Sequence, residues 1–472
     1  MPEEIIKAPG QFDCLKSPSV LVIENLHYSP FHLAALILLI CAIIHTLFVH
    51  KIYAFAKKIE AKQTPPTENE EPQPRSIAVQ ALYFLAEVEI VFAIWVIPLF
   101  FTIAGSYGWK TALEYINTRD FTEALFIVII LSLATTRPIL QVSQTVLEKI
   151  AHKFGGTLSA WWFVLLTVGP LLGSIITEPG AMAITALLLS KKFYRFHPSP
   201  KLAYATLALL FTNVSVGGVL TNFASPAVLI LSRAWHWSNW HMFAHYGWKA
   251  AVGILLANAL YWLYFRKEFA QLNERKRIAD KISVASIEET RPIPKFVTAI
   301  HLLAMFVVVL NAHYPAIFIA AYLFFVGFHQ STRHHQDSLK MMRPLLVGLF
   351  IAGLVIHGGL QGWWVVKALL GLKPLQILGM TISLTGFNDN TAIAYLATLI
   401  QNLSDAAKYA LVTGVICGGG LTVIANAPNP AGFVILAEYF QGSASSWKIF
   451  LAALLPTCVL FLIYSLFGPL LF

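Results

Sequence analysis

Residues 383–400, SLTGFNDNTAIAYLATLI, hold a single carboxylate, Asp389, between the amides of Asn388 and Asn390 in an otherwise apolar segment. The whole chain is apolar: 57% of its 472 residues are hydrophobic, 12% are charged, and the mean hydropathy is +0.67. A soluble domain carries about twice that share of charged residues. Many apolar runs are about 20 residues long, which is enough to cross a hydrocarbon core about 30 Å thick. The sequence therefore predicts an all-α polytopic membrane protein whose main partner is the lipid bilayer.

Several other classes of protein are not indicated. The net charge of +9 does not indicate a nucleic-acid partner, because excess Lys and Arg in a membrane protein usually mark cytoplasmic loops. The four cysteines are scattered and suggest neither a disulfide framework nor a zinc site. The first 30 residues lack the basic start and apolar core of a signal peptide. No nucleophile–base or metal-ligand constellation stands out at membrane depth, so we expect neither an enzyme nor a cofactor.

The apolar segments are of two kinds. Eight are uninterrupted and each predicts one crossing: 31–50, 79–104, 121–141, 245–265, 294–311, 314–328, 343–360 and 449–472. Two more, 158–190 and 374–400, are interrupted at mid-course by TEPGA (177–181) and GFNDNT (386–391), and each predicts a hairpin that enters the membrane and returns. Each hairpin is followed by a crossing with a break, at GGVLTNFASP (217–226) and at GGGLTVIANAPNP (418–430).

The two halves of the chain repeat this pattern: three crossings, a re-entrant hairpin, a broken helix and a final crossing. Matching the Leu-Thr pairs of the two breaks places Ser225 opposite Asn426, and matching the Ala-Ile pairs that follow the hairpin tips places Gly180 opposite Asp389. Five crossings in each half is an odd number, so the second half is predicted to be inverted relative to the first. Inverted repeats with broken helices are typical of secondary transporters.

Charge placement supports this topology and predicts its orientation. If the N-terminus lies on one side, the segments assigned to the opposite side hold 24 of the 33 Lys and Arg residues. That opposite side is therefore predicted to be cytoplasmic, and both termini periplasmic. The expected division is a periplasmic N-terminal segment 1–30, a first repeat 31–265, a cytoplasmic linker 266–292 and a second, inverted repeat 293–472.

The hairpin tips and helix breaks are the candidate functional site. Non-helical backbone survives in a bilayer only inside protein or along a cavity, and unwound carbonyls attract cations. Asp389 adds a charge and its neighbours add neutral oxygens, which together predict an oxygen cage for a hard monovalent cation, sodium. The residues expected to bind the ion in the second half are Thr385, Asn388, Asn390, Thr391, Gly419, Thr422, Ala425, Asn426 and Asn429. Those expected in the first half are Thr177, Gly180, Gly218, Thr221, Asn222 and Ser225, with Glu178 as the carboxylate.

Simpler roles stand beside these. Asp389 or Glu178 could cap a helix or bond a neighbour, but an ionisable group at membrane depth is costly and usually functional. Glu178 precedes Pro179, so a helix-terminal role competes more strongly there. Glu87 and Glu89, in AEVEIVF, are candidates for a proton relay or for structural pairing.

The motifs TEPGAMAITALLL (177–189), TGFNDNTAIAYL (385–396) and GGGLTVIANAPNPAG (418–432) resemble those of a bacterial sodium/proton antiporter family in the ion transporter superfamily. That superfamily also contains NhaD-type antiporters, arsenite permeases and divalent-anion/sodium symporters. The resemblance extends from about residue 31 to the end of the chain. It implies two inverted repeats, a homodimer with a static scaffold and a moving transport domain, and a place in the bacterial inner membrane.

The resemblance includes one departure. The dicarboxylate symporters carry a neutral Ser-Asn-Thr at their hairpin tips, whereas this chain has Glu178-Pro179-Gly180 and Asn388-Asp389-Asn390, and acids favour cations and protons. We therefore expect Na+/H+ exchange by alternating access. A sodium-coupled symporter of a small organic or inorganic anion is the alternative. Lithium and potassium remain open as the transported cation.

Overall fold

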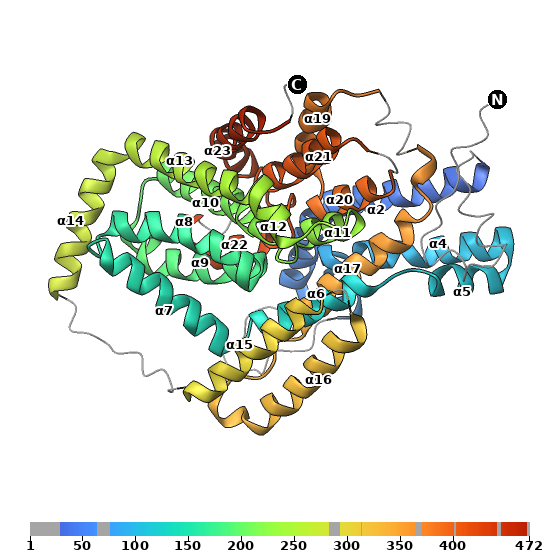
Figure 1. Cartoon of the computed structure of the whole chain (residues 1–472), viewed down its shortest axis with the longest axis horizontal. Coiled ribbons are helices and arrows are strands. Elements are labelled where there is room, and N and C mark those ends of the chain that lie inside the picture. Colours follow the sequence, from blue (N-terminus) through green and yellow to red (C-terminus); the bar gives the residue numbers. More distant parts are fainter. Residues whose placement is uncertain are drawn as a thin grey trace. The chain divides into compact units, whose positions relative to one another are not determined.

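The computed structural model describes residues 29–63, 76–282, 293–312, 314–364, 371–400, 403–440 and 445–469. Every regular element in these ranges is a helix, as predicted (Figure 1). Most of the predicted N-terminal segment 1–30 and residues 283–292 of the predicted linker lie outside the described residues. The chain forms two compact units, the first from residues 1–121, 349–370 and 399–401 and the second from the rest.

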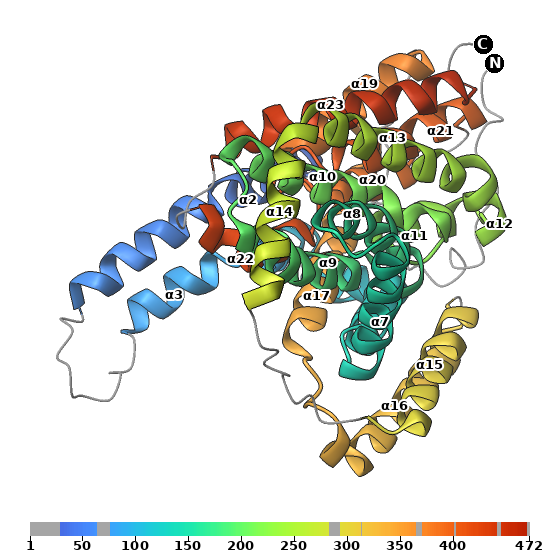
Figure 2. The same cartoon turned by 90° about the vertical axis from the view of Figure 1, so that its left-hand side faces the viewer.

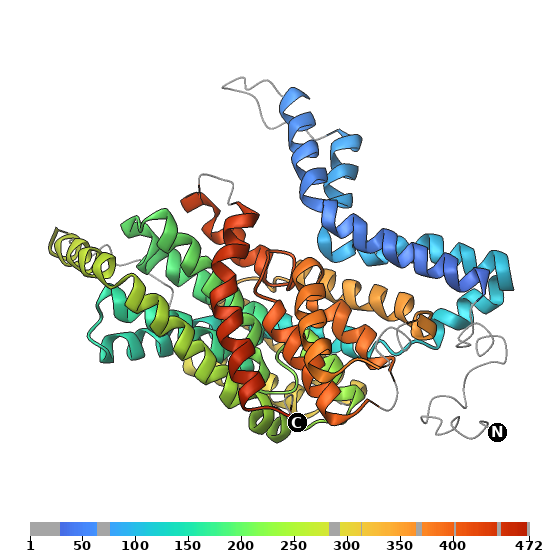
Figure 3. The ribbon, with the colours of Figure 1, turned by 90° about the horizontal axis from the view of Figure 1, so that it is seen from above.

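The first unit is built from long, bent helices. Its elements are α2 (Pro30–Gln63), α3 (Ile77–Leu85), the 3-10 turn η2 (Val88–Ile90), α4 (Val91–Tyr107), α5 (Trp109–Asn117) and the end of α17 (Met342–Gly358). Helix α2 bends by 55°, and α3 runs beside its far half (Figure 3). The segment expected to cross at 79–104 is interrupted at η2, where His45 Nε2 lies 2.8 Å from the Leu85 carbonyl oxygen.

The second unit holds both predicted hairpins and both predicted broken helices. From its first half come α6 (Thr122–Ala134), α7 (Arg137–Lys153), α8 (Leu158–Ile176), α9 (Glu178–Lys192), η3 (Tyr194–Phe196), α10 (Pro200–Gly217), η4 (Gly218–Leu220), α11 (Pro226–Ala234), α12 (Asn239–Met242), a π-helical turn η5 (Phe243–Gly247), α13 (Trp248–Tyr264) and α14 (Arg266–Ile282). From its second half come α15 (Lys295–Leu310), α16 (Pro315–Ser331), η6 (Arg333–His335), the start of α17, α19 (Pro374–Phe387), α20 (Asn390–Thr398), α21 (Asp405–Gly418), α22 (Asn429–Leu436), η7 (Ala437–Phe440) and α23 (Ser446–Leu466).

Local chemistry sets where these helices begin. Ser and Thr side chains accept backbone N–H groups at the starts of α8, α10, α21 and α23. Proline occupies the first turn of α9, α10, α11, α16, α19 and α22, where its missing N–H leaves no bond unmade. These boundaries place the turns between α8 and α9 and between α19 and α20 at the two predicted hairpin tips.

Three helices, α8, α10 with η4, and α23, are individually long and apolar enough to cross a membrane, and the number rises to six if each bent pair forms one span. One such pair is α6 and α7, which meet at 64° where the sequence predicted one crossing over 121–141. Helices α15 and α16 form an antiparallel hairpin (Figure 2). The pattern is that of a multi-pass helical membrane protein.

The predicted linker begins with a folded helix, α14. Helix α14 buries Phe269 and Leu272 and packs against α8. Both carboxylate oxygens of Glu268 accept hydrogen bonds from Ser199, one from its backbone N–H at 2.6 Å and one from its hydroxyl at 2.9 Å. Since Ser199 caps α10, the linker helix helps to fix the start of the first broken helix.

A proline inside α8 explains a buried amide pair. Pro170 has no N–H, so the Leu166 carbonyl oxygen loses its helical partner. The amides of Asn213 and Asn258 both donate to that oxygen, at 2.8 and 2.9 Å, and Asn213 also donates to the Asn258 side chain. These asparagines hold α8, α10 and α13 together within an apolar interior.

Candidate functional site

Each hairpin tip is tied to the broken helix of its own half by the same two hydrogen bonds. The backbone N–H of Glu178 donates to the Ala224 carbonyl at 3.1 Å, and that of Asn390 donates to the Ala425 carbonyl at 3.0 Å. The Thr221 hydroxyl donates to the carbonyl of Ser174 at 2.7 Å, just before the first tip. In the second half, Thr422 bonds Gly386 in the same way at 2.9 Å.

These equivalent bonds define which residues of the two halves correspond. Glu178 occupies the place of Asn390, Thr177 that of Asp389, and Ser225 that of Asn426. The prediction that placed Ser225 opposite Asn426 agrees with these contacts. The one that placed Gly180 opposite Asp389 was shifted by three residues, because the Ala-Ile pairs used for it lie beyond the tip and occupy different turns of α9 and α20.

The halves also pack across each other. Helix α9 of the first hairpin lies beside α22 of the second broken helix, and α20 of the second hairpin lies beside α11 of the first (Figure 1). The Ser215 hydroxyl on α10 donates to the Ile416 carbonyl on α21 at 2.8 Å. A Cβ on Gly419 would lie 2.2 Å from that same hydroxyl oxygen, so only glycine permits this approach. The crossed packing brings residues of both halves to one centre.

Glu178 lies at this centre and is fully buried. The Asn426 amide of the opposite half donates to its Oε2 at 3.2 Å. Its Oε1 has no hydrogen-bond partner in the protein. Gly218 lies against the same side chain, and a Cβ there would come within 2.7 Å of Glu178 Cγ and 2.8 Å of Oε1. A buried carboxylate with one oxygen unsatisfied is unfavourable as a bare anion and is stabilised by a proton or a bound cation.

Thr177, the residue before it, has a strained backbone. Its φ of 69° is left-handed, which is unusual for a β-branched side chain. Such a conformation costs about 1–3 kcal/mol and is found mainly where a functional site requires it. Here it turns the chain so that α9 begins directly at Glu178.

Asp389 is 4% exposed and has a capping role in addition to its charge. Its Oδ1 accepts the backbone N–H of Thr391 at 2.8 Å in the first turn of α20. This bond realises the helix-capping role considered from the sequence. Asp389 and Glu178 are thus both buried acids, one at each tip.

Oxygen atoms dominate the unsatisfied polar groups around the two tips. The buried side-chain atoms there that lack a hydrogen-bond partner in the protein are Thr177 Oγ1, Glu178 Oε1, Ser225 Oγ, Thr385 Oγ1, Asn388 Oδ1, Asn426 Oδ1 and Asn429 Oδ1, together with one nitrogen, Asn390 Nδ2. Within the described part of the chain, no group of three or more His, Cys, Asp or Glu side chains is arranged to hold a metal ion. Hydroxyl, amide and carboxylate oxygens are the ligands that hard cations prefer.

Other predicted site residues serve the backbone. Asn429 donates its amide to the carbonyls of Gly419 and Thr422, at 2.8 and 2.9 Å, which holds the second break in shape. Thr391 bonds Asn390 at 3.3 Å, and Gly180 packs near Ala134.

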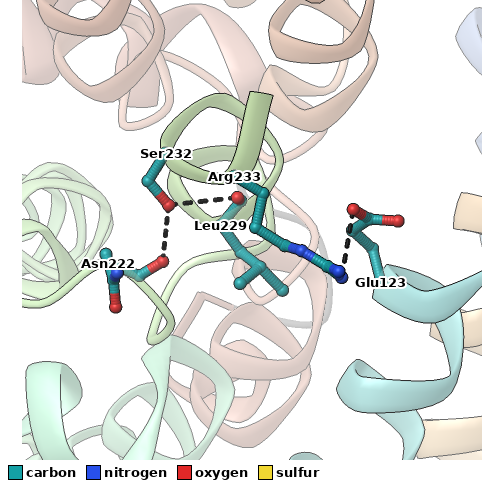
Figure 4. A network of polar contacts seen from close by, with 5 residues as sticks. All are labelled: Glu123, Asn222, Leu229, Ser232 and Arg233. Atoms are coloured by element: carbon teal, nitrogen blue, oxygen red, sulfur yellow. Dashed lines mark hydrogen bonds and ion pairs between the residues drawn. The ribbon is translucent and has the colours of Figure 1, made fainter. Parts of the chain in front are cut away.

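Asn222 points toward the loop that follows α11, where its amide donates to the Trp237 carbonyl at 2.9 Å. The Ser232 hydroxyl donates to its backbone carbonyl (Figure 4). Asn222 is thus engaged at the far end of α11, and none of its hydrogen bonds reaches either carboxylate.

Glu87 and Glu89 lie at or beside η2 in the first compact unit, both half-buried, whereas the carboxylate centre belongs to the second. Their proton-relay role stays a prediction.

Sequence reasoning missed an ion pair at the end of the first broken helix. Arg233, in the last turn of α11, lies 3.1 Å from Glu123 in the first turn of α6, and both side chains are largely buried (Figure 4). It also missed Lys249, whose buried ammonium donates to the Tyr409 hydroxyl at 2.9 Å. A charged residue next to a long apolar segment was the available signal in both cases.

These features define a multi-pass helical membrane protein whose interior holds two buried carboxylates in an oxygen-rich centre between two hairpins and two broken helices. The family model described as "Putative Na+/H+ antiporter" matches residues 30–467, and the chain belongs to this family. The family consists of transporters, not enzymes, and membership supports cation/proton exchange in general. No curated protein matches the chain.

Proposed function

We propose that the chain is a secondary active antiporter that exchanges Na+ for H+ by alternating access, with Glu178 and Asp389 as the groups that carry the ions. The observation that carries the proposal is Glu178: a fully buried carboxylate with an unsatisfied oxygen that accepts a hydrogen bond from Asn426 of the opposite half. Neighbouring unsatisfied oxygens supply the neutral ligands that a sodium ion needs.

Competition for these carboxylates gives exchange. Two buried acids in a dry centre are stable when a proton or a cation neutralises part of their charge, so the two ions exclude each other. If the ion site becomes accessible from the other side of the membrane only when Na+ or H+ neutralises its charge, it carries Na+ in one direction and H+ in the other. No chemical bond is made or broken, and no cofactor is part of this scheme.

We propose that the two halves are inverted repeats. The equivalent bonds at the two tips and the crossed packing of α9 with α22 and of α20 with α11 support this. At two corresponding positions, one half has an acid and the other a neutral residue. Glu178 corresponds to Asn390, and Asp389 corresponds to Thr177. This favours one shared ion site with two carboxylates over two equivalent sites.

We also propose an orientation in the membrane, a superfamily relationship and a homodimeric assembly for the chain. The concentration of Lys and Arg in the loops of one side supports cytoplasmic placement of those loops and periplasmic termini in a bacterial inner membrane. The sequence resemblance supports a relationship to the ion transporter superfamily and a homodimer with a moving transport domain.

Proteoliposomes with a lumenal pH indicator test the function. We expect a sodium gradient to drive proton movement with no organic anion present. The apparent sodium affinity should weaken about tenfold for each pH unit that is lowered through the range where the site takes up one proton, because each bound ion must displace one. Proton movement that begins only when a small organic or inorganic anion is added would replace the antiporter with the anion symporter.

A further inference from the structure

His45 joins two interruptions in the helices of the first compact unit. It lies just before the 55° bend of α2, which separates Pro30–Thr46 from Lys51–Lys62 (Figure 3). On the neighbouring helix, α3 ends at Leu85, and the chain passes through η2 before α4 begins. His45 Nε2 lies 2.8 Å from the Leu85 carbonyl oxygen, and the Trp95 indole nitrogen lies 3.2 Å from His45 Nδ1. One half-buried imidazole therefore bonds both the end of α3 and the second turn of α4.

These two hydrogen bonds fix the position of the proton on the imidazole ring. An indole nitrogen only donates, so Nδ1 of His45 accepts the Trp95 N–H through its lone pair. A carbonyl oxygen only accepts, so Nε2 carries the hydrogen that is donated to Leu85. His45 is therefore held as the neutral tautomer with its hydrogen on Nε2, and Nδ1 is the ring atom that can take up a further proton.

A proton on Nδ1 of His45 and the hydrogen bond from Trp95 exclude each other. Once Nδ1 carries a hydrogen it has no lone pair to offer, and two N–H groups then point at each other across 3.2 Å. The bond to the Leu85 carbonyl changes in the opposite direction, because a charged imidazolium is a stronger donor than a neutral ring. Uptake of a proton thus breaks the bond to α4 and strengthens the bond to α3.

The break between α3 and α4 also carries two acids. Glu87 and Glu89 lie at or beside η2, both half-buried, and the sequence predicts a proton relay or structural pairing for them. His45 adds a base to the same break through its bond to Leu85. Other described titratable side chains near this joint are Tyr83, which donates to Glu60 of α2, and Cys41 and Lys51 of α2.

We propose that Nδ1 of His45 is a proton-binding site, and that proton uptake there releases Trp95, and with it the start of α4, from the bend of α2. The site belongs to the first compact unit, whereas the carboxylate centre belongs to the second. It makes the joint between α2, α3 and α4 responsive to pH. The inference follows from two hydrogen bonds and does not rest on the proposed antiport function.

The fluorescence of Trp95 tests the site in the full-length protein in detergent, with no sodium gradient. Subtracting the emission of Trp95→Phe from that of the parent isolates Trp95 among the 12 tryptophans, and the same subtraction is made in each variant background. The difference is recorded across about pH 4–9, which spans the usual range of histidine titration in proteins. We expect one transition with the slope of a single proton, because the indole N–H loses its acceptor.

Two amide variants and one matched control assign the transition. His45→Gln and His45→Asn supply an acceptor and a donor but do not titrate, so both should lose the transition. His32→Gln removes another histidine of α2 and should keep it. A flat difference signal in the parent, or a transition that persists in either His45 variant, overturns the proposal. Loss of the transition in His32→Gln also overturns it, because the titrating group is then not His45.

Discussion

Replacing Glu178 by glutamine should abolish or nearly abolish exchange, since glutamine keeps the shape of the side chain and its contact with Asn426 but removes the charge. A monovalent cation about 4 Å from a carboxylate gains about 4 kcal/mol at an effective dielectric constant of about 20. At about 1.4 kcal/mol for each factor of ten, this loss weakens sodium binding about a thousandfold. Because Glu178 is fully buried and its Oε1 is unsatisfied, we expect most of this loss in sodium affinity to be measured.

The assay is the sodium dependence of proton movement in proteoliposomes, with binding measured in parallel by sodium-dependent thermal stabilisation. Glu438→Gln is the matched control, because it removes an exposed carboxylate from η7 and should leave both readouts unchanged. An apparent sodium affinity of Glu178→Gln within tenfold of the parent, at a similar maximal rate, would refute the placement of the ion at this carboxylate.

Three further changes test the surrounding structure. Asp389→Asn should abolish exchange and keep the fold, because asparagine also caps a helix, whereas Asp389→Ala should in addition lower the stability by about 1 kcal/mol through loss of the bond to Thr391; equal melting temperatures of the two variants would contradict the capping role. Asn258→Leu should lower the unfolding free energy by about 1–3 kcal/mol in detergent, since it removes a partner of the Leu166 carbonyl that Pro170 leaves free. The double variant with Asn213→Leu should lose less unfolding free energy than the sum of the two single changes, because both amides donate to one oxygen. Glu123→Gln and Arg233→Gln should each destabilise the protein, and a double-mutant cycle should give a coupling energy of about 1 kcal/mol or more, as the pair is largely buried; strictly additive effects would show that the ion pair does not hold α11 against α6.

Much of the carboxylate centre follows from the sequence. Asp389 between two amides, the glycines and prolines of the breaks and the isolated TEPGA motif are all polar or helix-breaking residues in apolar segments, and such residues have no favourable place facing lipid. The structure has a helix–helix turn at both predicted tips and a break at both predicted positions. Polar and helix-breaking residues within apolar segments of a membrane protein thus allow its buried site to be predicted from a single sequence.

Contacts between distant segments leave a weaker signal. The bond from Asn426 to Glu178 joins residues 248 positions apart, and no spacing rule predicts which amide reaches which carboxylate. The alignment of the tips failed for a related reason: similar Ala-Ile pairs recur along any apolar helix, so only the hydrogen bonds of Glu178 and Asn390 fix the true register. The bend between α6 and α7 was also missed, although Thr135, Thr136 and the Arg137-Pro138 pair mark it within the 121–141 segment.

The corrected register changes the expected chemistry of the site. Two equivalent acids at equivalent positions would allow one ion in each half, bound independently. Instead Glu178 and Asp389 occupy different positions of a shared pattern, and Asn426 links the second half directly to Glu178. If both acids belong to one ion site, as proposed, uptake of an ion at one carboxylate alters the affinity at the other. A single shared centre, as proposed, would therefore require residues of both halves of the chain to neutralise one transported ion.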